Sequence, residues 1–172
     1  AGPLMRGLAN EINQSLHLAI LSGDHILVVG QVDSPGNNVM SVRLGAKIDI
    51  WRASSGRVIL AHLPEEVLHE TIEKVPLPEG VALDKLQGEL HNIQKLGHEV
   101  MDSFVVSGVV NISAPIIDHS GHAIAALTVP HINRVGDDLS FSDCVDSLVL
   151  ATRNLSTSLG GEAALVDRTA AS

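Results

Sequence analysis

The sequence has 172 residues, the length of one ordinary domain, and its 45% hydrophobic and 18% charged content excludes a disordered chain. The net charge is −9, from 11 basic and 20 acidic residues, without any run of Lys or Arg, which excludes a nucleic-acid-binding surface. The single cysteine, Cys144, cannot form an internal disulfide, and no apolar run reaches the length of a bilayer span. With no signal-peptide pattern in residues 1–8, these features predict a cytoplasmic domain.

The first third of the chain predicts one helix followed by three strands. Apolar residues recur at helical spacing after Pro3, and we expect residues 1–15 to hold the end of a linker helix and the first helix of the domain. Residues 16–21 and 25–32 predict two strands joined by a turn at Gly23. After a turn cluster at 33–38, alternating residues predict a third strand at 39–44, and residues 45–53 predict an irregular segment.

Three helices are predicted in the middle of the chain. The first follows Ser54-Ser55-Gly56 and is expected to have a serine cap, and the second begins directly after Pro64. The third is expected to have Asp84 as its cap and to end at Gly97.

The last third returns to strands at 105–117 and 123–129, joined by a turn at 119–122. Ser140 and Asp143 form a capping pattern for a last helix that ends at Gly160-Gly161, and residues 162–172 are expected to be a flexible tail. The order of elements predicts an α+β fold with a mostly antiparallel central sheet flanked by helices.

Several stretches of the sequence resemble the effector-binding, C-terminal domain of IclR-type transcription regulators. They lie at 43–66 with the run AHLPEE, at 96–100, at 108–118 with APIID, and at 121–130 with GHAIAALTVP, followed by Arg134. The resemblance implies a GAF-like or profilin-like sandwich at 16–161 that senses a small molecule. It also implies that a winged helix-turn-helix domain, not present in this chain, precedes it in the family.

The resemblance further implies a ligand pocket between the sheet and the helix that starts near Ser54. Carried over position by position, the expected ligand-binding residues are Trp51, Ser54, Ser55, Met101, Asp102, Asn111 and Thr128. The family more often has a proline at position 49, a histidine at 51, an acid at 101 and a cysteine at 111.

Elementary chemistry supports part of this set independently. First-turn N–H groups of a helix have no intrahelical partners and favour a carboxylate, so Ser54 and Ser55 suit an organic acid. Asn111 and Thr128 interrupt apolar strands, where an unpaired polar group costs about 1–3 kcal/mol, so each needs a ligand, a neighbouring strand or a water as partner. Trp51 suits either stacking on a planar acid or packing into the core.

Other functions have weaker support. His119, His122 and His131 suggest a metal site, but no Cys pair or HExxH helix completes a ligand set, so we expect no metal and no cofactor. No GxSxG motif is present and Cys144 lies on an apolar helix stripe, so we expect no catalytic residues and no enzyme.

The sequence therefore predicts the ligand-sensing domain of a transcription regulator. Its expected partners are a carboxylate effector, copies of itself in a homodimer or homotetramer, and DNA only through the missing domain, with no membrane partner. The alternative is a free-standing GAF-like module that binds a small molecule and has no DNA-binding function.

Overall fold

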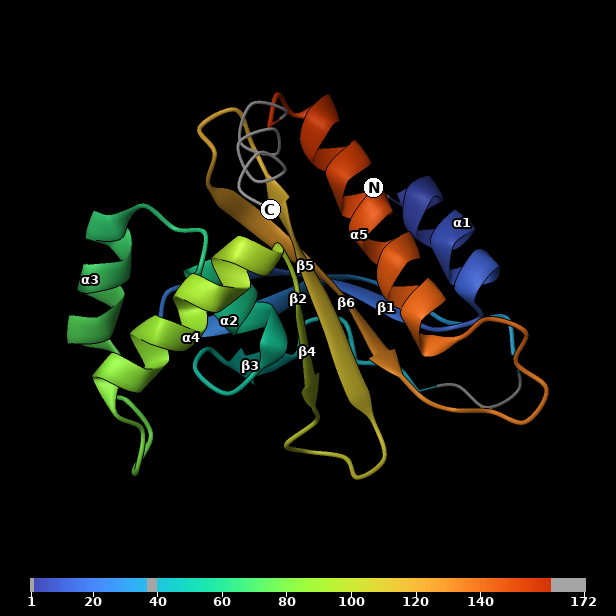
Figure 1. Ribbon diagram of the computed structural model, residues 1–172, viewed down its shortest axis with the longest axis horizontal. Helices are drawn as coiled ribbons and strands as arrows, with labels where there is room; N and C mark the ends of the chain where they lie inside the picture. The colour runs from blue at the N-terminus through green and yellow to red at the C-terminus, as the bar shows by residue number, and fades with distance from the viewer. Residues whose placement is uncertain (1, 37–39, 162–172) are drawn as a thin grey trace.

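The computed structural model describes residues 2–36 and 40–161 and places helices on both faces of one sheet (Figure 1). The strands are β1 (Leu16–Ser22), β2 (His25–Val32), β3 (Lys47–Asp49), β4 (Glu99–Asp102), β5 (Val110–Ile117) and β6 (Ala123–His131). The helices are α1 (Gly2–Ile12), α2 (Ser54–Leu60), α3 (Glu65–Lys74), α4 (Leu83–Leu96) and α5 (Phe141–Ser158).

The six strands form a single sheet in the order β3-β2-β1-β6-β5-β4, with every neighbouring pair antiparallel. The two long hairpins, β1–β2 and β5–β6, meet where β1 pairs with β6. This arrangement confirms the predicted α+β fold with a mostly antiparallel sheet. β4 is a strand in addition to the two that the sequence located in the last third of the chain.

Each face of the sheet has its own apolar cluster. On one face, α1 and α5 pack against β5 and β6 through residues such as Leu8, Leu148 and Ile112. On the other face, α2 and α4 pack over the sheet through Val58, Leu90 and their neighbours. Figure 1 shows α1 and α5 side by side, with α2, α3 and α4 on the opposite side of the sheet.

The prediction of a third strand at 39–44 is wrong. Position 39 lies outside the described residues, and residues 40–44 form no strand; β3 lies instead within the segment predicted to be irregular. The backbone rejoins β2 at Gly45, where φ is +82° and the N–H donates to the carbonyl oxygen of Val28 at 2.9 Å. Residues 40–44 therefore form a loop beside the sheet.

The start of one strand and the N-terminal caps of two helices also differ from prediction. The strand expected from 105 begins at Val110, because Ser103 Oγ accepts hydrogen bonds from the N–H groups of Val105 and Val106 and holds 103–109 as a loop. Neither expected helix cap forms: the N-caps of α2 and α4 are Ala53 and Ala82, without side-chain hydrogen bonds.

The last helix begins as predicted. Ser140 Oγ accepts the N–H of Asp143, and the Asp143 carboxylate accepts the N–H of Ser140 in return, which forms a capping box. The tail expected at 162–172 lies outside the described residues.

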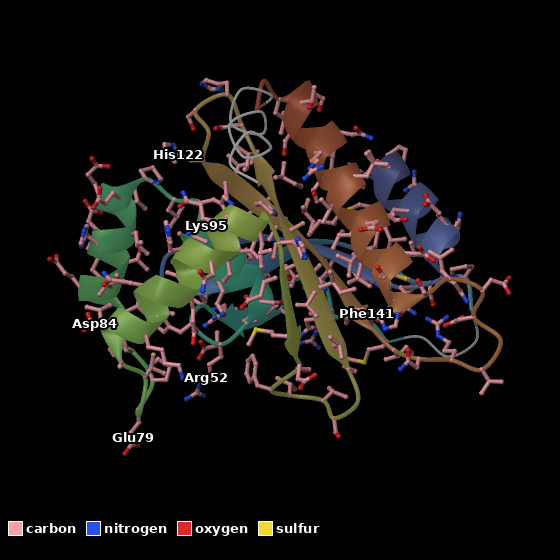
Figure 2. All side chains as sticks on the ribbon, in the orientation of Figure 1. Arg52, Glu79, Asp84, Lys95, His122 and Phe141 are labelled. Carbon is pink, nitrogen blue, oxygen red and sulfur yellow. The ribbon has the colours of Figure 1, made fainter. Side chains whose placement is uncertain are left out.

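The outer surface of the α3–α4 side is charged. Figure 2 shows Glu79 and Asp84 at the periphery of this side and Lys95 near the C-terminal end of α4, and all three are exposed. Within the described ranges, no helix combines the length and the apolar composition that crossing a bilayer requires.

Candidate functional site

A cavity of about 180 Å³ lies between the start of α2, the sheet and two loops. Its polar lining residues are His17, Ser54, Ser55, Ser103, Asn111 and Thr128. Its apolar lining residues are Met40, Val42, Ile48, Ala53, Phe104, Val105, Val106, Val109 and Pro130. None of these described residues carries a permanent charge, so the cavity offers a bound molecule only neutral donors and acceptors.

The turn before α2 places the helix start against the sheet. Asp49 Oδ1 accepts hydrogen bonds from the N–H groups of Trp51 and Arg52, at 2.8 and 2.9 Å, and this closes a tight turn. The turn packs directly on the helix, because a Cβ atom at Gly56 would lie 2.3 Å from the carbonyl oxygen of Ile50. Asp49, where the family often has proline, therefore shapes the backbone that leads to Ser54.

A chain of three buried hydroxyl groups joins α2 to the sheet. Ser54 Oγ lies 2.7 Å from Ser113 Oγ, which lies 2.6 Å from Thr128 Oγ1. Ser54 and Thr128 line the cavity, whereas Ser113 lies behind them on β5 and is fully buried. The hydroxyl of Ser54 thus joins this chain in place of the predicted helix cap.

The hydroxyl chain belongs to a polar row that crosses the sheet on the α2 side. Antiparallel register sets His17 of β1 opposite Thr128 of β6, Thr128 opposite Ser113 of β5, and Ser113 opposite Glu99 of β4. Directly opposed residues share one face of a sheet, so the row runs from the cavity to Glu99.

The end of this row distant from the cavity is an ion-pair network. Arg57 of α2 donates from Nε to Glu99 at 2.9 Å and from Nη2 to Glu89 of α4 at 2.7 Å. Burial raises the pKa of Glu99, although Arg57 opposes this shift. The same short helix is therefore joined to the sheet at its first residue, by Ser54, and at its middle, by Arg57.

His17 is the titratable side chain of the cavity lining. The residue is buried, neither ring nitrogen makes a hydrogen bond with the described residues, and Nδ1 is enclosed. Burial lowers the pKa of His17 to about 4. The ring is therefore a neutral imidazole at physiological pH.

The structure brings four of the seven sequence-predicted residues together: Ser54, Ser55, Asn111 and Thr128 all line the cavity. Met101 and Asp102 lie on the edge strand β4 and do not line it. Trp51 also lies elsewhere: it is buried in the α2–α4 cluster, and its indole N–H donates to the carbonyl oxygen of Pro76 at 3.1 Å. Of the two interpretations of Trp51, the structure favours packing in the core.

Sequence reasoning missed His17 and both cavity loops. Met40 and Val42 produced the alternating pattern that was interpreted as a strand, but they line the cavity from a loop. Phe104 and Val105 also line it, while 51% and 76% of their surfaces remain exposed to solvent. Large exposed apolar residues beside the Ser103 turn were the available signal for this second loop.

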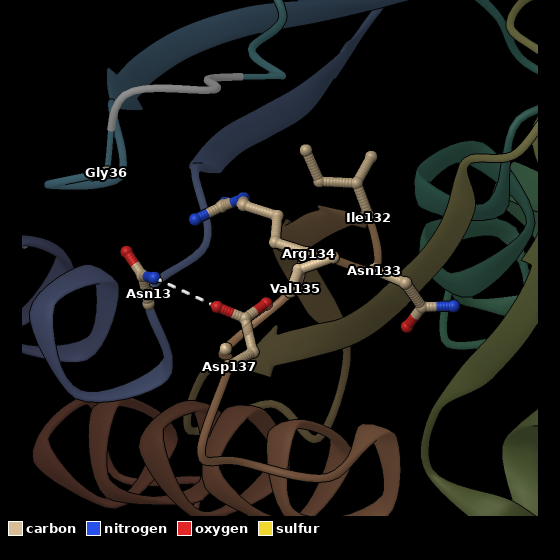
Figure 3. A pocket seen from close by; sticks show the side chains of 8 residues that line it. Asn13, Gly36, Ile132, Asn133, Arg134, Val135 and Asp137 are labelled. Atoms are coloured by element: carbon tan, nitrogen blue, oxygen red, sulfur yellow. Dashed lines mark hydrogen bonds between the residues drawn. The ribbon is translucent and has the colours of Figure 1, made fainter.

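A second, open hollow of about 610 Å³ lies beside the loop after β6 (Figure 3). Asn13 Nδ2 donates to Asp137 Oδ1 at 3.1 Å across it, and Arg134 extends toward the segment of Ser34 and Gly36, donating to Ser34 Oγ at 3.4 Å. Arg134 Nη1 lies so close to Gly36 that a Cβ there would be 2.9 Å away. These contacts hold neighbouring loops together.

The metal and enzyme alternatives depend on histidine, acidic and cysteine side chains, which the structure places as follows within the described residues. Among the residues that the structure describes, no three His, Cys, Asp or Glu side chains gather as metal ligands would. Cys144 is buried against the α1–α5 side of the sheet, and burial raises the pKa of its thiol.

Comparison with known proteins identifies the family. Residues 1–157 match the family described as "Bacterial transcriptional regulator IclR C-terminal". The chain belongs to the IclR C-terminal domain family. Among curated relatives of this IclR domain, the HTH-type transcriptional repressor AllR of Klebsiella pneumoniae is 28% identical over 166 residues, covering 92% of this chain and 60% of the repressor. The chain therefore spans less than two thirds of that relative.

Solved IclR structures share the fold. The crystal structure of Thermotoga maritima IclR superposes with a TM-score of 0.79 at 25% identity, covering 93% of this chain and 67% of that one. An IclR homologue from Microbacterium hydrocarbonoxydans, complexed with 4-hydroxybenzoate, superposes with a TM-score of 0.73 at 25% identity, covering 92% and 66%. The matched relatives are named as transcriptional regulators, so the family as a whole is one of regulators and not of enzymes.

Proposed function

We propose that this IclR C-terminal domain senses a small organic acid, which it binds in the cavity at the start of α2. The single observation that carries the proposal is the cavity itself, a partly open and mostly apolar space with a few neutral polar groups in its lining. The 4-hydroxybenzoate complex of the Microbacterium homologue supports an acid of this size.

The domain acts by a shift in population. An effector changes operator binding only through its differential affinity for two arrangements of the whole regulator, typically a coupling of about 1–3 kcal/mol. We propose that a winged helix-turn-helix domain precedes this domain in the full regulator and reads DNA in the cytoplasm. The domain itself carries out no catalysis, and the reading frame upstream of residue 1 is expected to encode the helix-turn-helix.

Ligand binding is tested by a thermal-shift screen followed by calorimetry. The panel contains 4-hydroxybenzoate, benzoate and short aliphatic monocarboxylates. We expect at least one acid to bind with one site per chain, and Thr128→Val, which removes a cavity hydroxyl at constant shape, to weaken that binding about tenfold.

Thr152→Val is the matched control, because Thr152 is equally buried but lies on α5, where its hydroxyl bonds the carbonyl oxygen of Val149. The Thr152→Val variant should bind the same acid with the affinity of the unmodified chain. Absence of binding by every acid in the panel, or equal affinity in the Thr128→Val variant, contradicts the proposal.

A further inference from the structure

The cavity has a donor arrangement that specifies the charge of its ligand. The inference rests on the proposed function, because it names the class of acid that the cavity accepts. Three side chains carry it: His17 and Thr128, which face each other across the β1–β6 pair, and Ser113 behind Thr128.

The enclosed nitrogen of His17 fixes the tautomer of the ring. Nδ1 is buried and has no hydrogen-bond partner among the described residues. A buried N–H without an acceptor is more costly than a buried lone pair without a donor, so the ring proton belongs on Nε2. Protonation of Nδ1 would bury an unpaired N–H, which agrees with the low pKa of His17.

The hydroxyl chain supplies a second donor. Ser54, Ser113 and Thr128 have three hydroxyl hydrogens and make two hydrogen bonds with one another. When Ser113 accepts from one neighbour and donates to the other, the neighbour that accepts keeps its own hydrogen for the cavity, at the Ser54 end or at the Thr128 end. If Ser54 donates to Ser113 and Ser113 to Thr128, the free hydrogen is on Thr128, beside His17.

We propose that His17 Nε2–H and Thr128 Oγ1–H each donate to one oxygen of a single carboxylate, and that His17 remains neutral when the acid binds. No described residue of the lining is charged. The charged group of the polar row, Glu99, lies three strands away from His17 and is paired with Arg57 of α2. The two neutral donors take the place of a counter-ion for one carboxylate, and a second carboxylate would need a further set of donors, again without a counter-ion. The cavity therefore selects monocarboxylates over dicarboxylates and binds them without taking up a proton.

The experiment uses calorimetry of the full chain with four probes: benzoate and butanoate, succinate as the dicarboxylate matched to butanoate in length, and benzamide as the uncharged counterpart of benzoate. We expect butanoate to bind at least tenfold more tightly than succinate, and benzoate at least tenfold more tightly than benzamide. Titrations of benzoate in phosphate and Tris buffers at pH 7 should show no proton uptake. Its affinity should stay constant between pH 6 and 8.

Variants isolate the role of His17. His17→Leu should weaken benzoate binding ten- to hundredfold, whereas His17→Gln, which keeps an N–H donor, should restore most of it. His131→Gln is the control, because His131 is also buried on a strand but does not line the cavity. Nitrogen-15 spectra of the unmodified chain should show the Nε2–H form of His17.

Each result has a defined consequence. Uptake of about one proton per benzoate, a Nδ1–H tautomer, or equal binding by succinate and butanoate overturns this inference and leaves the proposed function intact. Unchanged benzoate affinity in the His17→Leu variant also overturns the inference and leaves the proposed function intact. If none of the acids binds, the proposed function fails, and this inference fails with it.

Discussion

At the scale of single residues, the hydroxyl chain shows how polar groups are placed inside an otherwise aliphatic sheet. Ser113 is fully buried, and it is the shared partner of Ser54 and Thr128. Its removal leaves two buried hydroxyl groups that each lose a neighbour, so the cost exceeds that of one exposed hydrogen bond.

We therefore predict that Ser113→Ala lowers the free energy of unfolding by about 1–3 kcal/mol in urea denaturation. Ser158→Ala is a suitable comparison, since that hydroxyl is exposed and bonds only its own helix. A change below about 0.5 kcal/mol for Ser113→Ala would show that water replaces the lost partner.

His17 makes the stability of the domain depend on pH. Its pKa is lowered by burial from 6.5 to about 4. Above pH 6.5 the ring is neutral in both the folded and the unfolded chain, and the stabilisation is fully present. As pH falls from 6.5 toward 4, the unfolded chain binds a proton that the folded chain rejects, and up to about 3 kcal/mol is lost.

His17→Gln cannot bind this proton, so its unfolding free energy should decline less between pH 7 and pH 4.5 than that of the unmodified chain. Urea denaturation at four pH values in this window measures the difference. Parallel pH profiles for the two proteins would place the ring in a solvated environment and contradict its burial.

At the scale of elements, α2 depends on a close backbone contact. The start of the helix lies on the Ile50 carbonyl, where a Cβ at Gly56 would be only 2.3 Å from oxygen. Gly88, in the exposed middle of α4, has no neighbouring atom within 4 Å of the same hypothetical Cβ. The two glycines thus have opposite roles in their helices.

Gly56→Ala should destabilise the domain by about 1–3 kcal/mol, because the helix or the turn must move. Gly88→Ala should stabilise it by about 0.5–1 kcal/mol, because alanine loses less backbone entropy in a helix. Thermal unfolding of both variants provides the check, and equal effects of the same sign would contradict the contact.

The helices and strands differ in how well the sequence pattern predicted them. Long periodic segments such as α1 and α5, and the two hairpins, depend on local spacing and were predicted with their correct types. Residues 40–44 were predicted with the wrong type. Met40 and Val42 are apolar because they line the cavity, and their alternation with polar residues is also the pattern of a strand with one face on a core. The cap at Ser54 failed because tertiary contact with Ser113 competes for the hydroxyl.

The candidate site could be predicted only in part for a related reason. Ser54, Ser55, Asn111 and Thr128 came from motif positions and from polar residues in apolar segments. His17 begins the hairpin among apolar residues, and only the β1–β6 register sets it opposite Thr128. Long-range pairing of this kind leaves no local pattern.

At the scale of the whole molecule, we predict self-association. Large apolar side chains such as Leu96 and Leu150 are 65% and 60% exposed, and contact with a second copy would remove such surface from water. Light scattering at micromolar concentration should give a mass of two or four times 18.1 kDa. A mass of one chain would contradict this prediction.

The position of Trp51 has a practical consequence for such measurements. It is the one tryptophan of the sequence. Its indole ring is buried in the cluster of α2 and α4, donates to the Pro76 carbonyl and does not line the cavity. Its intrinsic fluorescence will therefore report the melting of the helical face and remain nearly silent during an effector titration, so that one optical signal separates unfolding from occupancy.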